Sequence, residues 1–243
     1  MGEIELQIDT RSMIERDVYL YGEYESITFA RLRRLLRDGK IRNDIFVDIG
    51  ANIGIYSLRV SRLFSRIVAF EPNPAICARL RDNITLNGYA NITVFADAIG
   101  ATAEELWFCV PTEDNENHGV AGFSECYMQR AGIQYAKVTV SVRPLDTVLA
   151  LDLSRVSVIK LDVEGFELPA LRGMEKIVKA SRPLIIIEVT EEAQGRMGHT
   201  SQDVFAWFHQ HNYALHDERT FEVVTKPTTA NLFGLPVECQ GDL

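Results

Sequence analysis

The sequence predicts a single doubly wound α/β domain with a mostly parallel central sheet. Short apolar runs of strand type alternate with segments that carry apolar residues at helical spacing. The runs are almost continuously apolar, which is typical of parallel strands covered by helices on both faces. The length of 243 residues fits one such domain, which is large enough to bury a substantial core.

Strands and helices are expected in strict alternation. The predicted strands are residues 45–47, 67–70, 92–95, 156–159 and 184–187. The predicted crossover helices are residues 54–63, 75–86 and 168–180. Asn73-Pro74 and Leu168-Pro169 are typical of helix starts. Asn87-Gly88 and Asp38-Gly39 indicate helix ends and turns.

Two regions depart from this alternation. Residues 104–143 predict an insertion after strand three, with strand-like segments at 105–110 and 137–142 around a polar, mobile loop at 111–122. The C-terminal part predicts a helix over 203–211 and a β-hairpin of segments 213–216 and 221–225 at the sheet edge. Residues 1–40 are expected to form an N-terminal helical appendage, followed by a main domain at 41–243.

The charge balance disfavours some partners. The net charge is −9, so a broad electrostatic grip on nucleic acid is not expected. The basic cluster from Arg31 to Lys40 fits the solvated face of a helix that buries Leu32 and Leu35. The four cysteines show no metal or redox spacing, no secretory leader is recognised, and no apolar run reaches the about 20 residues of a spanning helix. We therefore expect a cytoplasmic protein without a membrane span.

Polar residues gather at the ends of the first three strands, where a doubly wound sheet binds ligands. Gly50 allows a tight turn after strand one, and Gly54 allows close approach of the next helix. Glu71 follows strand two and can accept hydrogen bonds from two ribose hydroxyls. Asp97 follows strand three and can accept from the adenine amine. An acid at a strand end also often caps the next helix, but the three ends together predict an adenosine pocket.

With these segments the sequence resembles the FkbM family of S-adenosylmethionine (SAM)-dependent methyltransferases. The segments that carry the resemblance are 48–54, 69–73, 83–88, 160–167, 171–173 and 183–188. The resemblance covers roughly residues 43–190 and implies a class I, Rossmann-like methyltransferase fold. It also implies SAM as methyl donor and, usually, a hydroxyl acceptor on a sugar or natural product.

The resemblance assigns residues to the cofactor. The expected SAM-binding set is Asp48, Gly50, Asn52, Gly54, Tyr56, Ser57, Glu71, Pro72, Asn73, Asp97, Ala98 and Asp162. Within this set, the residues from Asp48 to Gly54 would line the methionine end, Glu71 would hold the ribose, and Asp97 with Ala98 would flank the adenine. For Asp48, helix capping is an equally open role.

Transfer to a hydroxyl also needs a base. The candidates are Asp162, Glu164, Glu188 and His118. Asp162 ends a buried strand, where desolvation raises a carboxyl pKa, but we favour it as the partner of the SAM ammonium group. His118 lies on the polar loop and can equally be an ordinary exposed side chain. The acids can approach one another around a divalent ion, but their spacing does not establish one, and no metal is predicted.

Aromatic residues outside the sheet are further candidates. Phe123, Tyr127 and Tyr135 of the insertion can stack on a sugar or pack a small subdomain. Tyr21 and Tyr24 are expected to close over the cofactor, so that their substitution weakens SAM binding.

The sequence thus predicts an O-methyltransferase acting on a sugar, glycan or glycosylated natural product. The alternatives are an N-methyltransferase of a small molecule, a nicotinamide-dependent oxidoreductase and a non-catalytic SAM-binding module. Residues 162–165 lack the Pro-Pro-aromatic pattern of many amine methyltransferases, and the glycine turn lacks the middle glycine of a dinucleotide fingerprint. The expected partner is a small-molecule or carbohydrate acceptor, and a homodimer is compatible with the sequence.

Overall fold

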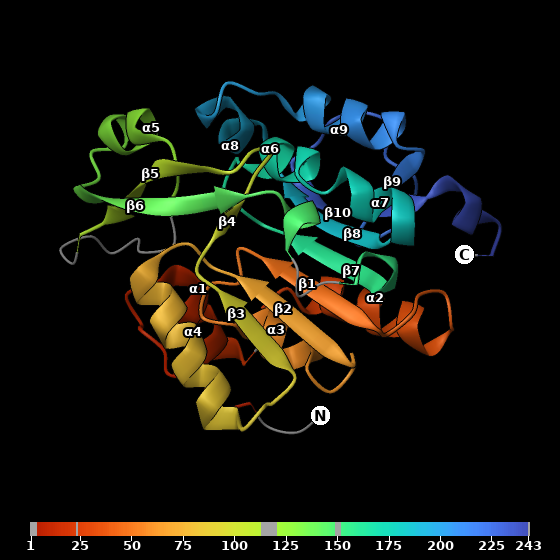
Figure 1. The fold of residues 1–243 in the computed structure, drawn as a ribbon, viewed down its shortest axis with the longest axis horizontal. Helices are drawn as coiled ribbons and strands as arrows, with labels where there is room; N and C mark the ends of the chain where they lie inside the picture. The colour runs from red at the N-terminus through yellow and green to blue at the C-terminus, as the bar shows by residue number, and fades with distance from the viewer. Residues whose placement is uncertain (1–3, 23, 113–120, 149–151, 243) are drawn as a thin grey trace.

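A seven-stranded sheet forms the centre of the molecule (Figure 1), and its strand order is β3-β2-β1-β7-β8-β10-β9. The computed structural model describes residues 4–22, 24–112, 121–148 and 152–242. The strands are β1 (Ile45–Ile49), β2 (Arg66–Phe70), β3 (Ile92–Phe95), β7 (Val156–Leu161), β8 (Leu184–Val189), β9 (Tyr213–Asp217) and β10 (Ala230–Pro236). Neighbours from β3 to β8 are parallel, whereas β10 is antiparallel to both of its neighbours. The predicted doubly wound, mostly parallel fold is confirmed.

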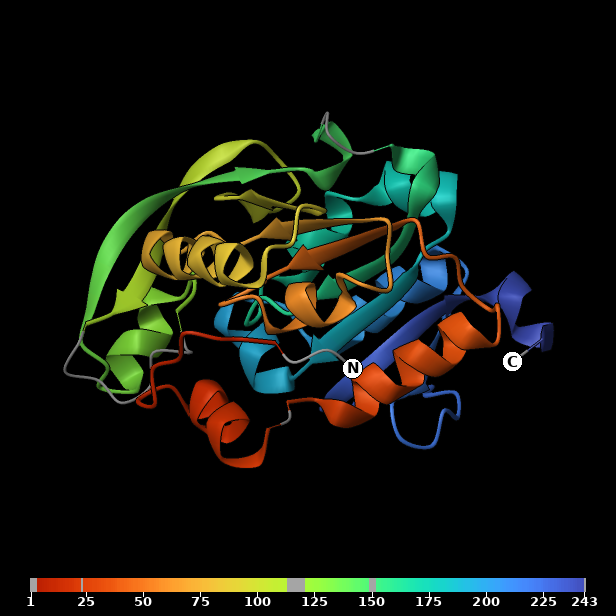
Figure 2. The same ribbon diagram turned by 90° about the horizontal axis from the view of Figure 1, so that it is seen from below.

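Helices cover both faces of this sheet (Figures 1 and 2). One face carries α2 (Ser26–Arg37), α3 (Ile55–Val60) and α4 (Pro74–Asn87). The other carries α6 (Glu167–Arg172), α7 (Glu175–Ser181) and α9 (Ser201–Gln210). Phe46 packs with the first group, whereas its neighbours Ile45 and Val47 pack with the second. Every residue of β1 is therefore buried, which explains the nearly continuous apolar runs of the sequence.

The predicted helix at 168–180 is wrong as a single helix, because α6 and α7 are separated at Gly173 and Met174. Gly173 packs against another loop so closely that an added Cβ would lie 2.1 Å from the carbonyl oxygen of Gly100. Asp146 then starts the second helix, since its carboxylate accepts from the backbone N–H groups of Lys176 and Ile177. Both causes are long-range contacts that helical spacing does not report.

The helix signals around α4 are confirmed. Asn73 caps its first turn, with the side chain accepting from the N–H of Ala75, and Pro74 is the first helical residue. Gly88 ends the helix at a φ of +64°. Pro169 lies in the first turn of α6 as predicted, but Leu168 is not the N-cap, because α6 begins at Glu167.

The insertion has its own small sheet, as predicted. β5 (Glu104–Pro111) and β6 (Tyr135–Arg143) pair antiparallel, and the short β4 (Ala98–Ile99) joins β6 in parallel. α5 (Glu125–Arg130) lies at the far end of this unit, to one side of the main sheet (Figure 1). The predicted loop falls largely on residues 113–120, including His118, and these lie outside the described residues.

The C-terminal prediction is partly wrong. α9 and β9 form close to the predicted positions, but residues 221–225 form no strand of the sheet and contribute an isolated bridge between Val223 and His216. The strand that pairs with β9 is β10, which enters between β8 and β9. Its Gly234 packs against the Phe208 ring of α9. A glycine and a terminal proline weaken a strand pattern, so this buried strand was missed.

The N-terminal part is helical, with α1 (Met13–Tyr21) preceding α2. Phe29, Leu32 and Leu35 of α2 are buried in the main core, while its arginines face outward as predicted. The division of the chain at residue 40 stays a prediction. In the described parts of the chain, no helix has the length and apolar character needed to cross a membrane. α8 (Glu191–Arg196) completes the α-helices described.

Candidate functional site

A pocket opens at the carboxyl ends of β1, β2, β7 and β8, where the strand order changes direction. It holds about 1200 Å³ of space, counting the part open to solvent. The predicted residues that line it are Asp48, Gly50, Asn52, Tyr56, Glu71, Pro72, Asn73, Asp97, Ala98, Asp162, Glu164 and Glu188. Gly54 and Ser57 do not line it. The structure thus brings most of the predicted set into one cavity, while their binding roles stay predictions.

Gly50 joins the two sides of this pocket. Its φ is +81°, and an added Cβ would lie only 1.9 Å from the carbonyl oxygen of Asp162. The Asp162 N–H donates to the carbonyl of Ile49 at 3.1 Å. Only glycine permits this approach, which places Asp162 directly beside the loop after β1.

Glu71 lies at the end of β2 and is almost fully buried. Its two carboxylate oxygens each accept one backbone N–H, from Asn52 at 2.9 Å and from Asn73 at 2.8 Å. Burial raises the pKa of Glu71 to about 7, and these hydrogen bonds limit the rise. The carboxylate is therefore fixed in position, with lone pairs left for further donors.

Asp48, at the end of β1, is held by the residue that was predicted to bind beside it. Ser57 Oγ donates to the Asp48 carboxylate at 2.6 Å, and burial raises the Asp48 pKa while this bond lowers it. Ser57 thus supports the pocket from behind. Gly54 contacts α4, since an added Cβ would lie 2.5 Å from a methyl carbon of Leu80.

The insertion contributes to the wall near Asp97. Arg143 of β6 pairs with the Asp97 carboxylate at 3.4 Å. Phe123 lines the pocket and packs against Phe166, with ring centroids 4.3 Å apart. Tyr127 and Tyr135 do not line it: the Arg196 guanidinium covers the Tyr127 ring, and the Tyr135 hydroxyl donates to Glu125. Tyr135 thus has its partner within the insertion, whereas Tyr127 contacts α8.

Asp162, Glu164 and Glu188, at the ends of β7 and β8, form an acidic wall of the pocket beside the buried Lys160. Lys160 Nζ lies 3.0 Å from the Asp162 carboxylate and 3.9 Å from that of Glu25. Burial lowers the pKa of Lys160, but these two carboxylates outweigh it and raise the pKa well above its usual value. Lys160 was not predicted as a site residue. Its signal was a charge within an apolar strand, because such a charge must be paired when buried.

Glu164 and Glu188 carry raised pKa values in this wall. Burial and the charge of Asp162 raise the Glu164 pKa to about 7, although Arg196 pairs with it at 3.4 Å. Burial and Asp162 raise the Glu188 pKa to about 8. Among the described residues, none forms a hydrogen bond or ion pair with the Glu188 carboxylate, which makes it the most available base of the three. The described residues contain no group of three possible ligands spaced for a metal ion.

The turn between α1 and α2 reaches into the acidic wall. Tyr24 lines the pocket, and the Glu25 carboxylate accepts from the Tyr56 hydroxyl at 2.5 Å. Glu25 has a φ of +46°, an unfavourable conformation for a residue with a side chain. Tyr21, by contrast, is 73% exposed and does not line the pocket, so its predicted place over the cofactor is wrong.

Three further side chains have structural contacts. Glu167 supports its loop, because its carboxylate accepts from the N–H groups of Val163 and Gly165. His211 stacks on Trp207 and His216 on Phe221, so both tail histidines have structural roles.

Comparison with known proteins identifies the family. The model of the methyltransferase FkbM domain matches residues 48–215. Methyltransferase sdnD from Sordaria araneosa is 31% identical over 160 residues, which cover 55% of this chain and 61% of the relative. The hexuronic acid methyltransferase AglP from Haloferax volcanii is 26% identical over 156 residues, which cover 64% and 60%. The matches thus span about three fifths of the length of these curated relatives.

Solved structures agree on the fold. A crystal structure of methyltransferase FkbM from Methylobacillus flagellatus has a TM-score of 0.50 at 20% identity, and the match covers 82% of this chain and 46% of that chain. A precorrin-6y C5,15-methyltransferase from Geobacter metallireducens also has a TM-score of 0.50, at 13% identity over 96% and 94% of the two chains. The family match includes Asp48, Glu71, Asp162 and Glu188. The chain therefore belongs to the FkbM methyltransferase family.

Proposed function

We propose that this protein transfers a methyl group from SAM to a hydroxyl group of a sugar, glycan or glycosylated natural product. The observation that carries the proposal is the buried Glu71 carboxylate, whose two oxygens are oriented by the N–H groups of Asn52 and Asn73. Two adjacent oxygens with free lone pairs match the two hydroxyls of a ribose.

The other pocket residues fit the remaining parts of SAM. Asp97, Ala98 and Phe123 offer an acceptor and apolar surface to the adenine ring. Asp162, whose backbone touches Gly50, offers a carboxylate to the ammonium group. When bound, SAM supplies a methyl group activated by the sulfonium charge. The hydrogen-bond acceptors of the pocket are therefore consistent with this cofactor.

Glu188 is the proposed general base. The acceptor hydroxyl must lose its proton as oxygen attacks carbon, and a carboxylate with a pKa near working pH contributes about 10²–10⁴-fold. Burial and Asp162 raise the Glu188 pKa to about 8, whereas Asp162 and Glu164 are engaged with Lys160 and Arg196. His118 stays a candidate outside the described residues.

Alignment is the second proposed contribution. The chain holds its pocket residues on strand ends, and the Gly50–Asp162 contact fixes the two sides relative to each other. Holding two reactants in line can supply about 7–11 kcal/mol. The apolar side chains of Phe123 and Phe166 would exclude water from the reacting groups.

A carbohydrate acceptor is favoured over the alternatives by two observations. A relative is named for the methylation of a hexuronic acid. The residues after β7, from Asp162 to Gly165, lack the proline and aromatic residues that often hold a planar amine. Methylation of a small-molecule nitrogen is the second candidate.

Two measurements test the proposal. Calorimetric titration with SAM and with NAD should show binding of SAM only, and binding of NAD alone would contradict it. Incubation with methyl-labelled SAM and a panel of neutral sugars, uronic acids and amino sugars should then label at least one acceptor. NMR of the product should place the methyl group on oxygen, whereas a methyl group on nitrogen would support the second candidate.

A further inference from the structure

One face of α4 presents a row of polar side chains to the N-terminal segment, residues 5–15. Arg79, Asn83 and Asn87 are spaced by four residues and so lie on one face of the helix. Four helical residues rise about 6 Å, and two residues of extended chain span about 6.6 Å. Alternate residues of an extended segment can therefore meet successive members of this row.

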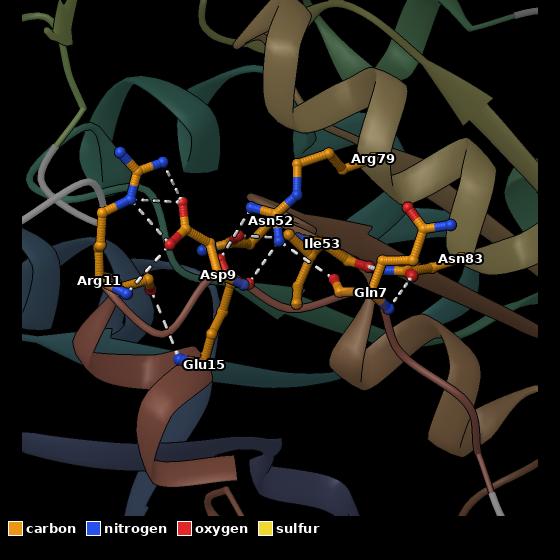
Figure 3. A network of polar contacts seen from close by, with 9 residues as sticks. Gln7, Asp9, Arg11, Glu15, Asn52, Ile53, Arg79 and Asn83 are labelled. Atoms are coloured by element: carbon orange, nitrogen blue, oxygen red, sulfur yellow. Dashed lines mark hydrogen bonds and ion pairs between the residues drawn. The ribbon is translucent and has the colours of Figure 1, made fainter. Parts of the chain in front are cut away.

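The contacts of Asn87 with Glu5 and of Asn83 with Gln7 follow this match, and Figure 3 shows the second pair. The Asn87 amide accepts from the Glu5 N–H at 3.0 Å and donates to the Glu5 carbonyl at 2.7 Å. Asn83 Oδ1 accepts from the Gln7 N–H at 2.7 Å. Arg79 donates to the Gln7 carbonyl at 3.1 Å and forms an ion pair with Glu15. Glu5 and Gln7 are thus bound through their backbone, whereas Glu15 is bound through its side chain.

Asn83 makes a second contact that Asn87 does not. Its Nδ2 donates to the carbonyl of Ile53 at 3.0 Å, and the whole side chain is buried. Ile53 follows Asn52, whose N–H donates to Glu71. One amide group therefore connects the N-terminal segment with the loop that orients the proposed ribose ligand (Figure 3).

The same segment also reaches the pocket directly. Ser12 and Glu15 both line it and are each only 3% exposed. Glu15 is held by Arg79 and by the N–H of Asp9. A ligand that fills the pocket would touch the segment at residues 12–15 and the loop at residues 50–52, which Asn83 connects.

We propose that Asn83 is a positioning residue that couples the N-terminal segment to the cofactor loop, so that ligand binding orders both. The proposal rests on SAM binding in this pocket. If one side chain holds two elements, the binding energy that orders one also favours the other, and the coupling is reciprocal. It also gives a role to the segment 83–88, which the proposed chemistry does not use.

The experiment combines calorimetry with hydrogen exchange on the full chain. In the wild type, SAM should slow amide exchange in residues 5–15. The Asn83→Leu variant should bind SAM about 30-fold more weakly, because it loses two hydrogen bonds, and it should lose this protection. Asn87→Leu is the matched control. It frees Glu5 but leaves the loop intact, so its SAM affinity should stay within about twofold of the wild type.

A second pair of variants tests the coupling from the segment side if Asn83→Leu fails to fold. Gln7→Pro removes the N–H that donates to Asn83, at an exposed position outside helices and strands, where proline is tolerated. Glu5→Pro removes the equivalent bond to Asn87. Gln7→Pro should reduce SAM affinity several-fold more than Glu5→Pro does.

Equal SAM affinities within each pair, or SAM binding without protection of residues 5–15, would overturn the inference. Failure of the wild type to bind SAM would instead contradict the proposed function. In that case the ligand-free proteins still decide the role of Asn83. Asn83→Leu should accelerate exchange in the loop around Asn52 whereas Asn87→Leu should not, and equal exchange in the two variants would also overturn it.

Discussion

The two sides of the pocket use carboxylates in different ways. On the side of β1 and β2, Asp48 and Glu71 are oriented by one hydroxyl and by two backbone N–H groups. On the side of β7 and β8, Asp162, Glu164 and Glu188 lie close to one another, with two nearby cations. Backbone N–H donors fix the position of a carboxylate, whereas neighbouring carboxylates raise one another's pKa and so make each a stronger base. The first arrangement suits the holding of a ligand and the second suits proton transfer.

The largest effect is expected from Glu188→Gln. If Glu188 is the base, the variant should lose about 10²–10⁴-fold in turnover while SAM affinity stays within twofold. The control is Glu192→Gln, which removes an exposed carboxylate on the neighbouring α8 that pairs with Arg196. Turnover of Glu188→Gln close to the wild type would assign the base elsewhere, with the undescribed His118 as the next candidate.

The pH profile sharpens the same assignment. A base must be ionised to accept a proton, and the Glu188 pKa is raised to about 8. Turnover should therefore rise with pH up to about 8 and then level off. A profile that levels off near pH 5 would mean that a carboxyl with an ordinary pKa is the base.

Gly50→Ala should disrupt the contact between the two sides. The new methyl group would overlap the carbonyl of Asp162 and would require a left-handed backbone at a φ of +81°. Overpacking and backbone strain together should cost about 3 kcal/mol in the free energy of unfolding. Gly132→Ala is the control, since its φ is +67° but nothing lies within 4 Å of the new atom. Urea unfolding that gave equal losses for both variants would show that the contact with Asp162 adds nothing.

Glu71→Gln should weaken ligand binding. The amide replaces one acceptor oxygen with a donor that would face a backbone N–H of Asn52 or Asn73. Loss of charge-assisted hydrogen bonds should weaken SAM binding about 10–100-fold. Calorimetry measures this loss, with Glu104→Gln in the insertion as an exposed control. Unchanged affinity would remove the central support for a ribose at this position.

The same contrast explains what could be predicted from the sequence. Glu71 and Asp97 were found because a strand followed by an acid is a local pattern, and the parallel sheet brings such ends together. Glu25 was missed because its partners Tyr56 and Lys160 lie far along the chain. Lys160 was missed although its partner Asp162 is only two residues away. Phe123 was left between stacking on a sugar and packing a subdomain, because its contact with Phe166 is also distant along the chain. β10 was missed because Gly234 serves the Phe208 contact, a long-range cause that strand propensity does not contain.

Stability should fall as pH rises from about 5 to 8. Burial raises the pKa to about 7 for Glu71 and Glu164 and to about 8 for Glu188. At pH values between the pKa of these carboxyls in the unfolded chain and their raised pKa in the folded chain, the folded chain binds more protons. Raising the pH through this range therefore favours unfolding. Without ligand, the decline should be at least about 1 kcal/mol. Urea unfolding of Glu71→Gln and Glu188→Gln at both pH values would show which side of the pocket contributes more, and a flat profile in the wild type would contradict the raised pKa values.

The smallest effect is expected at the turn between α1 and α2, where the two predicted tyrosines differ. Tyr24 lines the pocket, and burial together with Asp162 and Glu25 raises its pKa, so the hydroxyl stays protonated. Tyr24→Ala should weaken SAM binding a few-fold, since it removes an uncharged side chain that lines the pocket near Asp162 and Glu25. Tyr21→Ala is the matched control, because that side chain is exposed and should leave the affinity unchanged. If both variants bind SAM as the wild type does, the turn does not contact the cofactor, and its strained Glu25 would then serve only to hold Lys160 and Tyr56.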